Sequence, residues 1–171
     1  MNIDPISAPK FVLILDNAVL AWGLAACGFA QVSKLFFELI FKQRWSPSVL
    51  IETGGMPSSH SALVTGTAAG VGLQLGFDDP MFALASTIAF IVMYDASGIR
   101  RSAGLTAAKV NKMSKVNINE SSTEKTLKES LGHTKTEVLV GSLLGPTIAL
   151  PGILFIGSPL HLLQMIGLVS V

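Results

Sequence analysis

The sequence predicts an all-α integral membrane protein: one domain over residues 1–171, folded as a helical bundle with four spanning helices and a short fifth helix at the C-terminus. Half of the residues are hydrophobic and only 13% are charged, whereas a soluble domain carries roughly 25% charged residues. The apolar residues gather in long runs. The 16 glycines and eight prolines suit membrane helices, which tolerate both.

Two further features of composition limit the class of function. The net charge of +1 argues against a general nucleic-acid binder, because such proteins carry a strong positive field. The single cysteine, Cys27, excludes an internal disulfide and a zinc site built from cysteines. We therefore expect the lipid bilayer, and no nucleic acid, among the partners.

The chain opens with a short polar segment and a long apolar run. Residues 1–10 are predicted to be a loose N-terminus. Residues 11–41 are mainly apolar, which is longer than the ~20 residues that a spanning helix needs. Lys34 and Glu38 share one face near the end of this helix. They either pair with each other and extend towards the interface, or contribute to binding a ligand.

Two more helices are predicted in the middle of the chain. Residues 45–59 form a first loop, and residues 60–77 form a helix with glycines four apart, a spacing that lets helix backbones approach closely in a bilayer. Residues 77–80 (FDDP) make a tight turn. Residues 81–93 then cross back and end in the segment 94–104 (YDASGIRRSAG).

The last third of the chain begins with its only extended polar stretch. Residues 105–132 are predicted to be a flexible loop or an amphipathic surface helix. Residues 138–155 form the next apolar helix, in which Pro146 and Pro151 favour a bend. Residues 160–171 are too short to cross a membrane unaided.

Alternating crossings place the loop at 42–59 and the segment 100–137 on one side of the membrane. That side holds ten of the 12 lysines and arginines: Lys42, Arg44, Arg100, Arg101, Lys109, Lys112, Lys115, Lys125, Lys128 and Lys135. By the positive-inside rule this side is cytoplasmic, or stromal in an organelle. The same crossings gather a set of polar residues at this face: His60, Asp95, Arg100, Arg101, His133 and Glu137.

A polar turn, TGGMPSSHSA at residues 53–62, leads into the second helix. Ser58 or Ser59 can cap this helix. The helix start would direct free N–H groups and the positive end of the dipole at the turn, which makes an anion site with His60 beside it. The alternative is a capped helix with an incidental histidine.

The polar residues at this face suit phosphoryl transfer without a metal. His133 and Glu137 are four apart, so the carboxylate can accept a hydrogen bond from one ring nitrogen and free the other as nucleophile or base. His60 could protonate a leaving group. Arg100 and Arg101 carry planar donors that match phosphate oxygens; alternatively, they anchor the helix at the membrane surface.

Three segments carry a resemblance to a known family: residues 54–61 (GGMPSSHS), residues 94–101 (YDASGIRR), and residues 127–134 (LKESLGHT) with Glu137. They resemble the divergent branch of the type 2 phosphatidic acid phosphatase superfamily, which also includes bacterial acid phosphatases and vanadium-dependent haloperoxidases. The resemblance runs from about residue 31 to residue 145. It implies an α-helical bundle, and a phosphohistidine intermediate formed without a metal or other cofactor.

The resemblance also implies roles for individual residues. His60 would be the general acid, with Ser58 and the following backbone amide holding phosphate, and Ser59 stands where the family usually has glycine. His133 would be the nucleophile. Glu137 stands where the superfamily has an aspartate that orients this histidine.

Two positions depart from the family pattern. The arginine expected six residues before the nucleophile is Leu127, so another cation would have to replace it: Arg100, Arg101 or, less favourably, Lys128. The first motif, a lysine followed by an arginine and proline pair, is echoed only by Lys34, Lys42 and Arg44. Since losing one donor aimed at developing charge costs roughly a hundredfold or more in rate, an incomplete pocket would turn over slowly.

The sequence therefore favours a membrane phosphatase that acts on a lipid phosphate or a prenyl (di)phosphate through attack by His133, with Asp95 in a supporting role. The alternative is a non-enzymatic membrane protein that binds or moves phospholipids, or scaffolds an assembly, on an inherited bundle. The absent arginine motivates this alternative.

Overall fold

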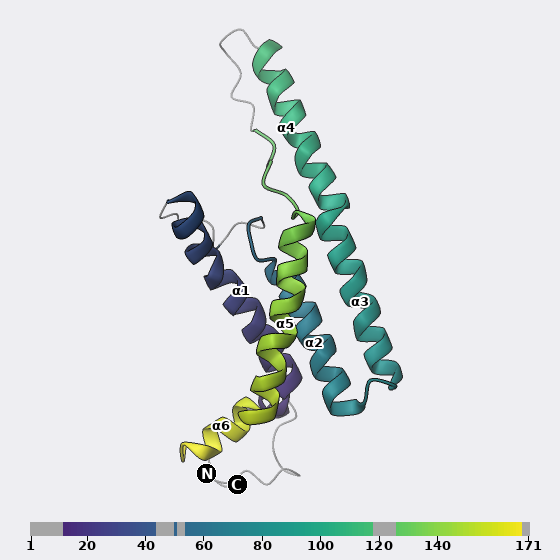
Figure 1. Cartoon of the computed structure of the whole chain (residues 1–171), viewed down its shortest axis with the longest axis vertical. Helices are drawn as coiled ribbons and strands as arrows, with labels where there is room; N and C mark the ends of the chain where they lie inside the picture. The colour runs from purple at the N-terminus through teal and green to yellow at the C-terminus, as the bar shows by residue number, and fades with distance from the viewer. Residues whose placement is uncertain (1–11, 44–49, 51–53, 118–125, 169–171) are drawn as a thin grey trace.

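The computed structural model describes residues 12–43, 50, 54–117 and 126–168, and the regular elements within these ranges are all helical (Figure 1). They are η1 (Val12–Asp16), α1 (Ala18–Lys42), α2 (Ser59–Leu75), α3 (Pro80–Ser97), α4 (Ile99–Asn117), α5 (Lys135–Phe155) and α6 (Pro159–Met165). The predicted all-α class is confirmed, and α6 is the predicted short C-terminal helix. The N-terminal segment 1–10 lies outside the described residues.

Helix α2 occupies the centre of the bundle and packs against α1, α3 and α5. Small residues make this packing possible. A Cβ atom on Gly66 would lie 3.1 Å from the carbonyl oxygen of Gly145, and one on Gly145 would lie 2.4 Å from that of Ala62. The backbones of α2 and α5 are therefore in direct contact, as the glycine spacing predicted.

This close contact gives a prediction about stability. A Cβ on Gly141 of α5 would lie 2.3 Å from the carbonyl oxygen of Ser58, so Gly141→Ala should force the two helices apart and destabilise the fold by about 1–3 kcal/mol. Gly28 of α1 is a matched control, because a Cβ there meets nothing within 4 Å. Thermal unfolding in detergent should show a lower Tm for Gly141→Ala only. An equal Tm for both variants would contradict the packing described.

Three stretches are long and apolar enough to cross a membrane: Ala18–Ile40, Pro80–Ser114 and Lys135–Phe155. Large apolar side chains on all three are exposed, among them Phe36, Phe90 and Leu143, which fits contact with lipid. Helix α2 has 17 residues, fewer than the ~20 that a spanning helix needs, and the other helices surround it. The bundle is that of a membrane protein, and its count of four spanning helices stays a prediction.

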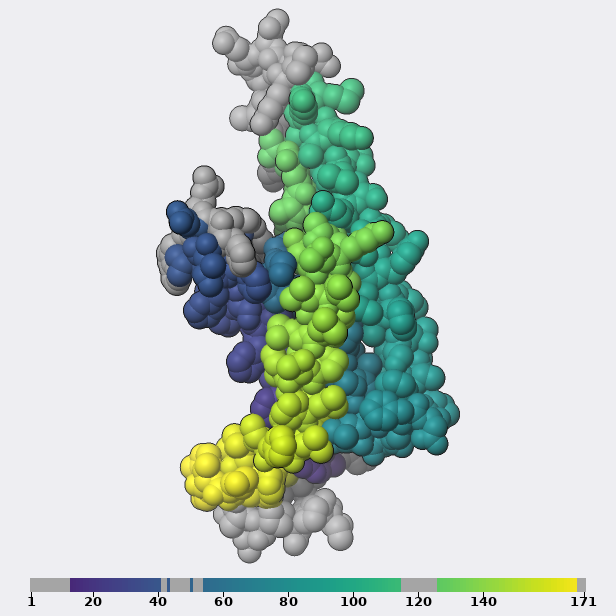
Figure 2. Space-filling model, in the orientation of Figure 1, coloured from purple at the N-terminus to yellow at the C-terminus, as the bar shows by residue number. Residues whose placement is uncertain are grey.

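One end of the bundle collects the chain segments that carry the predicted site. The last turn of α1, the first turns of α2 and α5 and the junction of α3 with α4 lie at this end, whereas α6 lies at the other (Figure 1). Helix α4 continues beyond the bundle in the direction of α3, and the projection is visible in Figure 2.

The polar stretch 105–132 is partly helical and partly non-helical within its described residues, so the choice between a flexible loop and an amphipathic surface helix stays a prediction. Its first part, to Asn117, is the helix α4, whereas residues 126–134 are not helical. These residues return alongside α4 towards the bundle (Figure 1). We call residues 126–133 the strap, because they connect the projecting part of the protein to the start of α5.

Candidate active site

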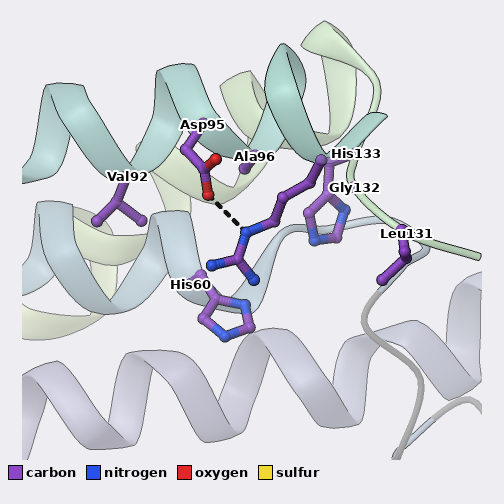
Figure 3. A pocket seen from close by; sticks show the side chains of 8 residues that line it. His60, Val92, Asp95, Ala96, Leu131, Gly132 and His133 are labelled. Atoms are coloured by element: carbon purple, nitrogen blue, oxygen red, sulfur yellow. Dashed lines mark hydrogen bonds and ion pairs between the residues drawn. The ribbon is translucent and has the colours of Figure 1, made fainter. Parts of the chain in front are cut away.

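A small cavity lies where α2, α3, α4 and the strap meet (Figure 3). Its volume is about 60 Å³, and since one water molecule needs about 10–15 Å³ on this measure, it has room for a few waters or one small oxyanion. The lining residues are His60, Val92, Asp95, Ala96, Arg100, Leu131, Gly132 and His133. Both histidines and one of the two arginines predicted from the sequence therefore line one cavity.

His133 is held from two sides at the end of the strap. Its backbone N–H donates to the carbonyl oxygen of Ala96 (2.9 Å), and its Nδ1 lies 3.0 Å from Oε2 of Glu137. The same Oε2 accepts the backbone N–H of Thr134 (3.1 Å), and the Thr134 hydroxyl accepts the N–H of Glu137 (3.2 Å). This reciprocal capping box starts α5. The hydrogen bond predicted from the four-residue spacing is present.

The second ring nitrogen of His133 has no hydrogen-bond partner in the part of the chain that the structure describes. The side chain is 3% exposed, and Nε2 is buried without a hydrogen bond to any residue that the structure describes. Because the carboxylate of Glu137 can only accept, the hydrogen bond places a proton on Nδ1, and in the neutral imidazole the lone pair is on Nε2. A buried polar atom without a partner costs free energy, so this atom calls for an explanation such as a catalytic role or a water in the cavity.

Arg100 is the cation that reaches the cavity. Its Nε donates to Oδ2 of Asp95 (2.5 Å), and Arg100 lines the same cavity as His60 and His133. Asp95 therefore orients this arginine and leaves the terminal N–H groups to point elsewhere. Arg101 is half-buried and is not among the lining residues.

His60 lies in the first turn of α2, outside the three stretches that could cross a membrane. Part of its ring is open to solvent. Burial of the rest lowers the pKa of His60 below its ordinary value of 6.5, and the positive charges of His133 in its protonated form, of Arg100 and of Lys34 lower this pKa further. The neutral imidazole is therefore favoured at neutral pH.

The two serines predicted to hold phosphate are buried away from the cavity. Ser58 is the N-cap of α2, and its Oγ accepts the N–H (3.3 Å) and the hydroxyl (2.8 Å) of Ser61. The N–H of Ser58 donates to the carbonyl oxygen of Glu137 (3.0 Å), which ties the start of α2 to α5. Neither Ser58 nor Ser59 lines the cavity. The cap predicted at this turn is present, whereas contact of the two serines with phosphate stays a prediction.

The predicted first motif contributes one residue near the site. Lys34 is 1% exposed, and its side chain lies against Gly55 of the polar turn. It does not line the cavity, but its charge acts on His60. Arg44 lies outside the described residues. Lys128 is exposed on the strap and is not among the lining residues.

Sequence reasoning missed the apolar wall of the cavity, which Val92, Ala96 and Leu131 provide. The signal for Val92 and Ala96 was their spacing of four residues, which puts them on one helix face close to Asp95. Sequence reasoning also missed Asn111, which is buried on the projecting part of α4 and bonds to the strap. A polar residue gives no local sign of such a distant contact.

The known proteins that this chain resembles are consistent with a helical membrane bundle. The model of the divergent PAP2 family matches residues 15–148. An uncharacterized membrane protein of Bacillus subtilis (strain 168), YuiD, is 40% identical over 150 residues, which cover 80% of this chain and 94% of that protein. No solved structure matches the chain significantly.

Proposed function

Because this chain belongs to the divergent PAP2 family, we propose that it is a membrane phosphatase that hydrolyses a lipid phosphate or a prenyl (di)phosphate through a phosphohistidine. The observation that carries the proposal is the Nε2 atom of His133. This atom is buried, unpaired within the described structure and held at a cavity by the hydrogen bond between Nδ1 and Glu137.

The reaction would proceed in two steps. In the first, the lone pair of Nε2 of His133 attacks phosphorus, the bond from phosphorus to the lipid oxygen breaks, and protonated His60 gives its proton to that oxygen. In the second, neutral His60 takes a proton from water, the hydroxide attacks phosphorus, and the bond to Nε2 breaks. Inorganic phosphate leaves and both imidazoles return to their starting states.

Arg100 would stabilise the negative charge that develops on the phosphoryl oxygens. It lines the same cavity as the two histidines, and Asp95 holds its guanidinium. Planar donors fixed before the reaction lower the barrier without reorganisation at the moment of transfer. This arrangement supports Arg100, rather than Arg101, as the replacement for the arginine that is absent at Leu127.

The surroundings of the cavity support a lipid as the substrate. Its walls include the apolar side chains of Val92, Ala96 and Leu131. Exposed apolar residues continue along α3, where Ile91 and Phe90 are 63% and 71% exposed. A phosphate group could enter the cavity while its acyl or prenyl chain stays along the bundle. The predicted cytoplasmic position of this face follows from the basic residues around it.

The test is release of inorganic phosphate by the purified protein from a lipid monophosphate and a prenyl diphosphate in detergent micelles. The matched blank is the double variant His60→Ala/His133→Ala, prepared in the same way, because it carries the same traces of host phosphatases. We expect release well above this blank. Equal rates for the two preparations would reject the proposal.

A non-enzymatic lipid-binding protein is the second candidate, because the electrostatics of the cavity argue against efficient phosphoryl transfer. The only lining guanidinium among the described residues is already paired with Asp95, and the lowered pKa of His60 reduces its positive charge. The cavity therefore has less cationic character than its residue list suggests. Binding of a lipid phosphate that survives His133→Ala, without turnover, would support this candidate.

The lowered pKa of His60 predicts an acidic optimum for hydrolysis. The leaving oxygen needs the proton of His60, and because the folded pKa is lowered, the protonated form is lost as pH rises through a value below 6.5. We expect kcat/KM, which reports the pKa values of the free protein, to fall along this limb in wild-type protein. In His60→Ala the rate should be lower at every pH and this limb should disappear. An unchanged limb in the variant would show that another group supplies the proton.

A further inference from the structure

The strap that carries His133 lacks helical structure of its own, so its backbone groups need partners elsewhere. Asn111 of α4 supplies two of them at the far end of the strap. Its Nδ2 donates to the carbonyl oxygen of Leu127 (2.8 Å), and its Oδ1 accepts the N–H of Leu127 (2.9 Å). The side-chain amide thus pairs with one residue through both backbone groups, as a neighbouring β-strand would.

The side chain of Asn111 is buried and uses all of its polar groups in hydrogen bonds around this contact. It is 7% exposed, and its second amide hydrogen is directed to Oε1 of Glu129 (2.8 Å). The side chain of Leu127 is 51% exposed, so Asn111 recognises the backbone there and not an apolar side chain. Such a set of three hydrogen bonds at a buried amide fixes the strap to one position along α4.

Two glycines allow the strap to lie directly on α4. A Cβ on Gly104, two helical turns before Asn111, would lie 2.7 Å from the carbonyl oxygen of Leu131. Gly132 has φ +77°, and a Cβ there would lie 2.3 Å from the backbone nitrogen of Arg101. The strap is therefore in backbone contact with α4 immediately before the residue that reaches the cavity.

The length of the extended strap matches the length of helix that it runs along. The six residues from Leu127 to His133 span about 20 Å when extended. The fifteen residues from Asn111 back to Ala96 span about 22 Å along a helix, and Ala96 accepts the N–H of His133. The strap is thus held at both ends against one nearly continuous helical rod, with no slack between the two points.

We propose that Asn111 is a positioning residue: by fixing the far end of the strap, it holds the imidazole of His133 at the cavity. Its own position is outside the cavity lining, so it acts only through the strap. The projecting part of α4 then has a structural purpose, since it is the support on which the nucleophile is placed. The kinetic consequence rests on the proposed function, whereas the structural consequence does not.

The experiment measures deuterium exchange at the C2–H of each histidine by mass spectrometry, in the full-length protein in detergent. Buried His133 should exchange slowly, and His161, exposed on α6, serves as the internal fast reference. In Asn111→Ala, His133 should exchange roughly tenfold faster or more, the factor expected when local opening becomes easier by the net contribution of one or two hydrogen bonds. The matched control is Met113→Ala, a 66% exposed residue of the same helix.

A second variant and a kinetic measurement make the result decisive. Asn111→Gln keeps the amide and should restore part of the protection of His133. If the protein hydrolyses lipid phosphate, Asn111→Ala should lower kcat with little change in KM, because His60 and Arg100 stay in place. Unchanged exchange at His133 in Asn111→Ala, with the Tm of the bundle preserved, would overturn the proposal even in a protein without turnover.

Discussion

His133→Ala is expected to lose phosphate release by at least about a thousandfold, the largest effect of any single substitution in this protein. The variant removes the atom that would form the covalent bond to phosphorus, and losses of this size are typical when an enzymatic nucleophile is deleted. The substitution should leave the fold intact, because Glu137 would still accept the N–H of Thr134 and start α5. Thermal unfolding of the variant checks this condition.

The same variant allows a direct test of the covalent intermediate. A substrate with a radiolabelled phosphate should transfer label to wild-type protein through an acid-labile bond, and His133→Ala should take up none. His161→Ala is the matched control, since this histidine is exposed on α6 at the other end of the bundle (Figure 1). Label retained by His133→Ala would assign the nucleophile to another residue, and hydrolysis without any label would indicate direct attack by water.

The helices of the bundle were predictable because apolar runs are a local property of the sequence. The residues at which the helices begin were harder to predict. Helix α5 begins at Lys135, three residues earlier than predicted, because Thr134 and Glu137 form a capping box; the pattern of a threonine followed three residues later by a glutamate was present in the sequence. Helix α1 begins at Ala18 instead of residue 11, since Asn17 caps it and accepts the N–H of Leu20 (2.9 Å).

The polar stretch 105–132 could not be assigned from its composition. Residues 105–117 are helical and residues 126–132 are not, and the difference depends on tertiary contacts. Asn111 and Leu127 are sixteen residues apart, yet their hydrogen bonds hold the strap in place. Hydrophobic periodicity carries no information about a pairing between a side-chain amide and a distant backbone.

Only part of the candidate site was predictable from the sequence. The contact of His133 with Glu137 followed from spacing within one helical turn, and the structure contains it. The burial of Ser58 could not be predicted from spacing, because it depends on how closely Gly141 of α5 approaches the start of α2. The choice between Arg100 and Arg101 also lay beyond the sequence. Neighbouring residues on a helix point about 100° apart, and only the packing of α3 and α4 decides which of the two faces the cavity.

The second large effect is expected for Arg100→Ala, which should lower kcat/KM for phosphate release by about a hundredfold or more. Arg100 lines the cavity together with the two histidines, so its removal takes away guanidinium donors at the place where charge would develop. Arg100→Lys should not restore the rate, because an ammonium group cannot donate to Asp95 and to phosphate through one rigid plane. Steady-state kinetics on the purified variants measures both effects.

Arg101→Ala is the matched control, since it removes the same charge from the next residue of the same helix. It should change kcat/KM by a much smaller factor, because Arg101 does not line the cavity. The comparison separates a specific role in catalysis from a general role of basic residues at the membrane surface, since surface anchoring would make the two variants alike. A larger loss in Arg101→Ala than in Arg100→Ala would transfer the phosphate contact to Arg101 and require α4 to turn about its axis when substrate binds.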